Sequence, residues 1–164
     1  MLKKLFPYIG EYKRPSILSP LFIAAEVLLE IMIPFLMASI IDNGLNKGDL
    51  NHILLMGGIT FVIAMVSLTL GVNAGKCAAE ASAGFAKNIR KELFHKIQKF
   101  SFTNIDKFST AGLITRFTTD ITNIQNSYQM ILRIFVRAPF MLVFATLMTI
   151  YINRELSFIF IGAV

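Results

Sequence analysis

Hydrophobic and polar positions are grouped along the chain in long blocks. Three apolar blocks, at about 15–41, 53–75 and 134–152, are long enough to cross a bilayer, which takes about 20 residues of helix. A fourth begins at Leu156. Backbone groups surrounded by lipid must bond within their own segment, so such blocks predict helices. We therefore expect an all-α membrane protein with three spans and the start of a fourth.

The third and fourth blocks need a further assumption each. The uncharged part of the third block, 138–152, is short, and it becomes adequate if residues 134–137 are included. The Arg137 side chain is then expected to reach back toward the membrane interface, with the rim of the cavity as the alternative. The fourth block consists of the last residues, "LSFIFIGAV", and stops without a closing signal. We expect that the chain is the front part of a longer polypeptide.

The positive charges predict the orientation. Of 16 Lys and Arg residues, four precede the first block and ten lie between Lys76 and Arg137. Only two lie in the short connectors at 42–52 and 153–155. Cytoplasmic segments of membrane proteins carry the excess of Lys and Arg. This predicts a multi-pass protein of the cell membrane, with a cytoplasmic amino terminus, a cytoplasmic middle segment at 76–133 and lipids as its surroundings.

Composition excludes several functional classes. The chain is 55% hydrophobic with a net charge of +6, and the orientation accounts for that charge. No basic patch is interleaved with stacking aromatic residues, so we expect no nucleic-acid partner. His52 and His95 lie far apart without ligand partners at metal spacing, which predicts no metal site. No G-x-x-x-x-G-K-[ST] loop is present, so we expect neither an ATP site nor a catalytic residue in this chain.

The middle segment has the pattern of two helical arms. Residues 75–102 contain no proline, and apolar residues recur there every third or fourth position, so the second span is expected to continue as helix for about 40 Å. A second arm, 122–135, leads back to the membrane. Small residues recur every four positions in two rows, which are Gly71, Gly75, Ala79 and Ala83, and Ala74, Ala78, Ser82 and Ala86. Such rows favour close helix packing, with a ligand groove as the alternative.

Between the arms lies an amphipathic stretch, 108–121, with the sequence "FSTAGLITRFTTDI". Gly112 permits a sharp turn before it. One face of a helix here would carry Leu113, Ile114, Phe117 and Ile121, and the polar residues Thr115, Arg116 and Asp120 would lie elsewhere around it. A short apolar-faced helix held away from the bilayer is a docking element, or its face packs against the two arms. Periodicity leaves both readings open.

These residues resemble the first intracellular loop of the ABC exporter transmembrane domain. The segment that carries the resemblance is "IRKELFHKIQKFSFTNIDKFSTAGLITRFTTDITNIQ", 89–125. It matches the family pattern at Arg90, Leu93, Phe100, Ser101, Phe108, Gly112, Leu113, Ile114, Thr115, Arg116 and Asp120. The stretch "EVLLEIMIPFLMASIIDNG", 26–44, also looks like the first span of the family, particularly of its bacterial multidrug and lipid exporters.

The resemblance implies an architecture and a mechanism. It implies six membrane helices per half-transporter, a second half that is identical or different, and a following nucleotide-binding domain that uses ATP and Mg²⁺. It implies that 112–120 is a coupling helix resting on the ATPase domains. A rigid helical lever can transmit the closure of the ATPase domains to the membrane, whereas a flexible loop would absorb that movement.

Three polar residues of the spans are candidates for the substrate pathway. Glu26 and Glu30 are four apart, so they share one face of a helix. Carboxylates are costly in a bilayer and usually face the bundle interior or a water-filled path, where they could attract cationic substrates or a coupling proton. The alternative is a hydrogen-bonded pair that fixes helix contacts. Asn73, near the inner end of the second span, could line the cytoplasmic mouth or anchor the helix at the interface.

Two other functional classes remain open at this point. A helical membrane sensor would use the cytoplasmic arms to relay a signal, and a structural membrane subunit would bind a partner without moving anything. An exporter would continue into further spans and a phosphate-binding loop, whereas a sensor would continue into a signalling domain.

Overall fold

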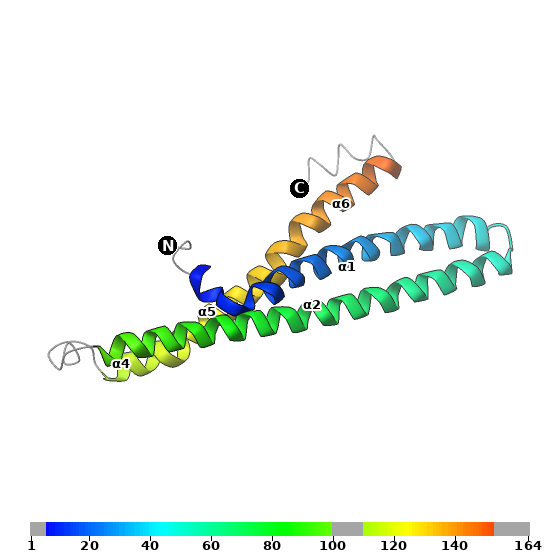
Figure 1. Ribbon diagram of the computed structural model, residues 1–164. Helices are drawn as coiled ribbons and strands as arrows, with labels where there is room; N and C mark the ends of the chain where they lie inside the picture. Colours follow the sequence, from blue (N-terminus) through cyan, green and yellow to red (C-terminus); the bar gives the residue numbers. More distant parts are fainter. Residues whose placement is uncertain (1–5, 100–109, 153–164) are drawn as a thin grey trace. The chain divides into compact units, whose positions relative to one another are not determined.

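The computed structural model describes residues 6–99 and 110–152, in which all the regular elements are helical. In chain order these are η2 (Phe6–Tyr12), α1 (Lys13–Ser39), η3 (Ile40–Leu45), α2 (Leu50–Gln98), α4 (Thr110–Thr115), η4 (Arg116–Asp120), α5 (Ile121–Met130), η5 (Ile131–Phe135) and α6 (Val136–Ile152) (Figure 1). The segments η3, η4 and η5 are π-helical, and η2 is a kinked 3₁₀ helix. The all-α prediction is confirmed.

The chain forms two compact units. Residues 1–19 and 75–133 make up one, which we call the arm unit. Residues 20–74 and 134–164 make up the other, which we call the span unit. Both α1 and α2 contribute to both units, so each unit combines segments that are far apart in the sequence.

A helical hairpin forms the first part of the span unit. From Pro20 onward α1 runs antiparallel to the first half of α2, and a tight turn joins them after η3 (Figure 1). The turn ends at Asp49, whose Oδ1 accepts the backbone N–H groups of Asn51 and His52 at 3.0 and 3.2 Å. A carboxylate there satisfies N–H groups that have no partner within the helix, so Asp49 fixes the start of α2.

The core of the span unit is small and apolar. Ile23 and Val27, one turn apart on α1, are buried together with Ala74 of α2. Partly buried side chains pack around them, namely Phe22, Ile31, Val136 and Phe144. Val136 and Phe144 bring α6 into the unit, so three helices meet at this core.

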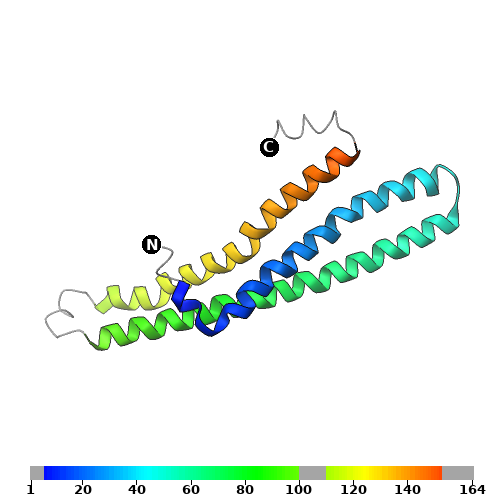
Figure 2. The same ribbon diagram turned by 45° about the horizontal axis from the view of Figure 1, so that its top comes forward.

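The arm unit is built on the second half of α2. The segment α4–η4–α5 runs back along it as an antiparallel neighbour, visible in both views (Figure 2). Ala78 and Ala81 are buried against Leu132, with Tyr128 beside them. The ring of Tyr128 lies against Phe85, and its hydroxyl donates to Ser16 Oγ at 2.9 Å. The arm unit therefore includes the beginning of α1 as well.

The amino-terminal segment, η2, also packs against the second half of α2, at Gly84, Lys87 and Asn88. Gly84 lies directly under the Tyr12 ring, where a Cβ atom would clash. Asn88 Nδ2 donates to the Tyr8 carbonyl at 2.9 Å. Lys87 Nζ pairs with Glu11 at 3.3 Å, and the hydrogen bonds to Glu11 and then Tyr12 raise the pKa of Lys87 above its ordinary value.

The two rows of small residues differ in burial. Ala74, Ala78, Ser82 and Ala86 form the row that is buried throughout, so it serves close packing as the spacing suggests. In the other row Ala79 and Ala83 are exposed. The row from Ala74 to Ala86 is thus a helix-packing surface, and the segments that pack closely against it leave no room for larger side chains.

Within the described residues, three helical stretches are long and apolar enough to cross a membrane, at Pro7–Leu45, Leu50–Gln98 and Arg116–Ile150. Their most apolar windows have mean hydropathies of 2.2, 2.4 and 1.8 and are at most 11% buried, so most of their apolar side chains are not covered by the rest of the chain. The helix α2 continues unbroken past the predicted span to Gln98, as expected. The predicted turn after residue 100, the 153–155 turn and the span beginning at Leu156 lie outside the described residues.

Candidate functional site

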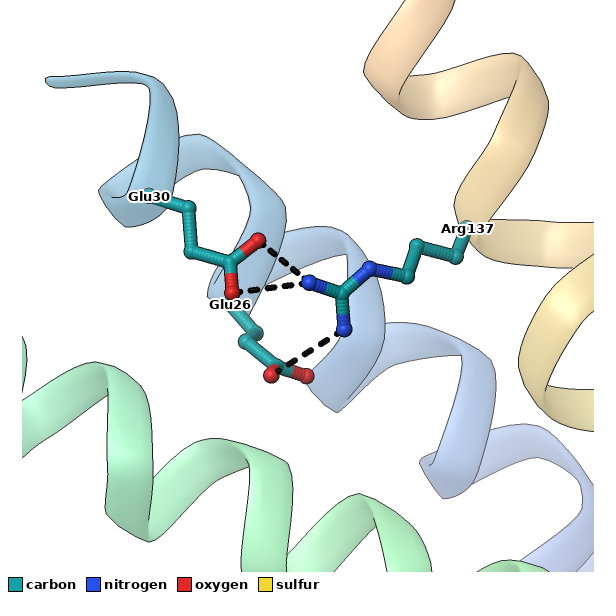
Figure 3. Close-up of polar contacts among 3 residues, drawn as sticks. All are labelled: Glu26, Glu30 and Arg137. Atoms are coloured by element: carbon teal, nitrogen blue, oxygen red, sulfur yellow. Dashed lines mark hydrogen bonds and ion pairs between the residues drawn. The ribbon is translucent and has the colours of Figure 1, made fainter. Parts of the chain in front are cut away.

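Three charged side chains of the span unit converge on one point. Glu26 and Glu30 project from successive turns of α1, and Arg137 projects toward them from the first turn of α6 (Figure 3). Arg137 Nη2 lies 2.7 and 2.6 Å from the two carboxylate oxygens of Glu30. Its Nη1 lies 3.4 Å from Glu26 Oε1. One guanidinium therefore ties both carboxylates to α6.

The burial of this ion cluster makes its pairing energetically important. The side chain of Glu26 is 14% exposed, that of Glu30 is 33% and that of Arg137 is 40%. Taking such charges out of water is costly, and an arginine that donates to both carboxylates offsets much of that cost. Removing one partner leaves a half-buried charge uncompensated. With two carboxylates and one guanidinium, the cluster has a formal charge of −1.

A glycine of α2 makes room for the cluster. A Cβ atom at Gly71 would lie 2.7 Å from Glu26 Oε1 and 3.0 Å from its carboxyl carbon, both too close for an unstrained contact. The absence of a side chain there allows the Glu26 carboxylate to lie against α2. The cluster is therefore framed by all three helices of the span unit.

The structure brings Glu26 and Glu30 together with Arg137, and Asn73 is not part of this cluster. Glu26 and Glu30 do share a face of α1, as their spacing predicts. Asn73 is exposed, and its Nδ2 donates to the Thr69 carbonyl of its own helix at 2.8 Å. The expectation that Arg137 reaches toward the interface is not what the structure shows, because its guanidinium turns to the two glutamates. The sequence did contain a signal for this pairing. Arg137 lies in the third apolar block and two glutamates lie in the first, and charged residues within a membrane usually pair with one another.

The amphipathic stretch of the arm unit forms the second candidate surface. Described from Thr110 onward, it belongs to a continuous helical run, α4–η4–α5. Ile114 is 59% exposed, Phe117 is half-buried and Ile121 is 2% exposed. The remaining members of the predicted docking segment that can be assessed are exposed, namely Gly112, Thr115, Arg116 and Asp120. The side chain of Leu113 lies outside the description.

The apolar residues of this stretch therefore do not share one environment. The π-helical turn η4 places a wider turn between Ile114 and Ile121, and one extra residue rotates the following positions by about 100°. Local hydrogen bonding fits this change, because Thr118 Oγ1 donates to the Ile114 carbonyl at 2.9 Å and Thr122 Oγ1 to the Thr118 carbonyl at 2.8 Å. Such bonds compete with the regular helix ladder.

Metal-binding groups are not assembled in the described parts of the chain, 6–99 and 110–152, where no three His, Cys, Asp or Glu side chains gather at ligand distance. His52 instead contacts Ser39 across the hairpin turn, with its Nε2 3.3 Å from Ser39 Oγ.

A comparison of the sequence with protein families decides the class. The model of the ABC transporter transmembrane region matches residues 16–164. The chain belongs to this family. ABC membership favours a transporter membrane domain over the sensor and structural-subunit alternatives, and together with the three long apolar helices it establishes an ABC exporter-type, multi-pass membrane segment.

Relatives of this ABC chain carry names that agree. It is 33% identical over 157 residues to the uncharacterized ABC transporter ATP-binding protein YfiB of Bacillus subtilis, covering 96% of the chain and 27% of that protein. It is 26% identical over 164 residues to the uncharacterized ABC transporter ATP-binding protein Rv1273c of Mycobacterium tuberculosis, covering 100% and 28%. It is 26% identical over 162 residues to the ATP-dependent lipid A-core flippase of Pseudoalteromonas translucida, covering 97% and 27%. The chain thus spans about a quarter of the length of these relatives.

Proposed function

We propose that this chain is the part of an ATP-driven exporter's membrane domain that contributes to the substrate pathway and receives the motion of the ATPase domains. The observation that carries the proposal is the half-buried ion cluster of Glu26, Glu30 and Arg137 within a segment that belongs to the ABC transmembrane family. Intramembrane ionisable residues mark pathways for ions and substrates more often than they serve lipid-facing surfaces.

The proposed topology follows the charge distribution. The spans are about 15–41, 53–75 and 134–152, a fourth starts at 156, and residues 76–133 form cytoplasmic arms. Single cysteines introduced at Asn46 and Thr119, both exposed, in a background with Cys77 replaced, test this arrangement. A membrane-impermeant maleimide should label the first in intact cells and the second only after permeabilisation. The reverse pattern would overturn the topology.

The proposed coupling element is 112–120, which rests on the ATPase domains of the complete transporter. Its support is the exposed Ile114 next to the half-buried Phe117, on a helical segment packed along α2. We expect ATP and Mg²⁺ to bind in nucleotide-binding domains outside this chain, and the names of the relatives support the use of ATP. A second half-transporter, identical or different, completes the pathway.

The proposed pathway residues are Glu26, Glu30 and Asn73, and the proposed substrates carry positive charge because the cluster is negative on balance. A lipid substrate is the second candidate, favoured by the name of the relatives that act on lipid A-core. Nucleotide-stimulated transport by the complete protein in vesicles, tested on cationic dyes, neutral dyes and lipids, separates the two.

The glutamates give the matching test of the site. The double variant Glu26→Gln, Glu30→Gln should reduce export of cationic dyes at least about tenfold more than export of neutral dyes, since an attractive interaction of only about 1.4 kcal/mol corresponds to that factor. Asn43→Asp, which alters charge in the extracellular turn, serves as the control and should leave the ratio unchanged. Equal loss for both kinds of dye would leave the glutamates with a structural role only.

A further inference from the structure

The ion cluster is asymmetric in how it satisfies its two carboxylates. Both oxygens of Glu30 lie within 2.7 Å of one guanidinium nitrogen, whereas Glu26 has a single contact of 3.4 Å. Glu26 is nevertheless the less exposed of the two, at 14% against 33%. The carboxylate that is harder to solvate therefore has the weaker ionic partner.

We infer that Arg137 is a specificity-determining residue, which neutralises Glu30 and leaves Glu26 to receive one positive charge from the substrate. This inference rests on the proposed function and narrows it to monocations. The charge balance follows directly, because two carboxylates and one guanidinium leave one negative charge in the cluster. A substrate with a single cationic group makes the site neutral, and a second cationic group would remain uncompensated in a medium of low dielectric constant.

The surroundings of Glu26 support the division of roles. Gly71 of α2 lets the Glu26 carboxylate lie close to the α2 backbone. Arg137 reaches both glutamates from the opposite side, on α6. The guanidinium contacts both carboxylates, but it supplies one positive charge against two negative ones. One unit of negative charge remains whichever way it turns.

The test changes the formal charge of the cluster and measures which dyes are exported. In the complete transporter, Arg137→Gln raises the cluster to two negative charges, Glu26→Gln reduces it to zero, and the double variant Glu30→Gln, Arg137→Gln keeps one. Three amphiphilic dyes of similar size, with zero, one and two positive charges, are offered to vesicles containing each variant. Arg133→Gln is the matched control, because Arg133 is an exposed arginine one helical turn earlier and its loss leaves the cluster intact.

The inference predicts a pattern across the variants. Wild type, the Arg133→Gln control and the double variant Glu30→Gln, Arg137→Gln should prefer the monocation. Glu26→Gln should lose monocation export about tenfold relative to the neutral dye, and Arg137→Gln should raise the ratio of dication to monocation export by about the same factor.

The experiment distinguishes a failure of the proposed pathway role from a failure of the inference about Arg137. If Glu26→Gln lowers export of all three dyes equally, the pathway role of the glutamates is wrong. If Glu26→Gln is selective but Arg137→Gln lowers all three dyes by one factor, Arg137 only holds the helices and the inference is overturned. Should Arg137→Gln fail to fold, the double variant decides, because monocation preference must survive the joint removal of Glu30 and Arg137. Loss of that preference in a folded double variant would also overturn the inference.

Discussion

The ring of Tyr128 lies 4.6 Å from the ring of Phe85, centroid to centroid, at an angle of 33°. This contact joins the returning helix to α2 within the arm unit, and the Tyr128 hydroxyl adds a hydrogen bond to Ser16 Oγ at 2.9 Å. One side chain therefore links the segments of the unit that are most distant in sequence. A rigid arm, which the proposed coupling needs, depends on such links.

Tyr128→Phe should lower the free energy of unfolding by about 1 kcal/mol, because it removes the hydroxyl while keeping the ring contact. Tyr128→Ala should cost about 2–3 kcal/mol, since the partly buried ring loses its contact with Phe85. Equilibrium unfolding in mixed detergent measures both. In a double-mutant cycle with Ser16→Ala, the effects of Tyr128→Phe and Ser16→Ala should fall short of additivity. Additive effects would argue against the hydrogen bond.

Ile114→Asp and Phe117→Asp, like Leu113→Asp on the same stretch, should uncouple transport from ATP hydrolysis in the complete protein. A charged side chain on the docking face must lose its hydration when the ATPase domain seats, which is costly. Transport per ATP hydrolysed should fall about tenfold or more while ATP binding is retained. Asn123→Asp, an exposed position on α5 outside 112–120, is the control and should keep normal coupling. Normal coupling in all three apolar variants would refute the docking role.

Gly71→Ala should stabilise the span unit less than an ordinary glycine-to-alanine change in a helix, because the new methyl group would push the Glu26 carboxylate aside. Gly58→Ala is the matched control on the same helix, since nothing lies within 4 Å of a Cβ atom there. It should be neutral or stabilising by about 0.5–1 kcal/mol through helix propensity. Thermal unfolding in detergent measures the difference. Equal stabilisation by the two variants would mean that displacing the Glu26 carboxylate costs nothing.

Glu11→Gln should speed the acylation of Lys87 by an amine-reactive reagent at about pH 9. The hydrogen bond to Glu11 is the main cause of the raised pKa of Lys87, so its loss lowers that pKa and increases the reactive free amine. In the wild type the ionic contact persists below the ordinary lysine pKa and is lost as pH rises through the raised value. Glu92→Gln, which removes the neighbouring pair with Lys96, should leave the rate at Lys87 unchanged. Peptide mass spectrometry quantifies both.

Much of the fold could be predicted from the sequence, because hydrophobic block length determines membrane helices and the absence of breakers determines that α2 continues. The row Ala74, Ala78, Ser82 and Ala86 was likewise readable as a packing row. Which of the two small-residue rows is buried could not be read, since their spacing is identical and only the neighbours distinguish them.

The candidate site was only half predictable. The shared face of Glu26 and Glu30 follows from helical spacing, but the partner on α6 depends on tertiary packing, and Arg137 was expected at the interface. The π-helical turn between Ile114 and Ile121 was also missed, because periodic analysis assumes a constant 3.6 residues per turn. Side-chain hydroxyls at Thr118 and Thr122 alter the local ladder in a way that apolar spacing does not record.

The stretch of α2 from Ala78 to Ala86 is covered on more than one side, by the amino-terminal segment at Gly84 and by the returning helix at Phe85. Apolar residues elsewhere on α2, such as Leu54 and Phe61, stand largely exposed. Evolutionary drift should therefore be uneven within a single helix. Leucine, isoleucine, valine and methionine should exchange freely at the outward positions. A saturation mutagenesis screen should find the buried small positions Ala78, Ala81, Ser82 and Ala86 tolerant of little beyond glycine, alanine and serine.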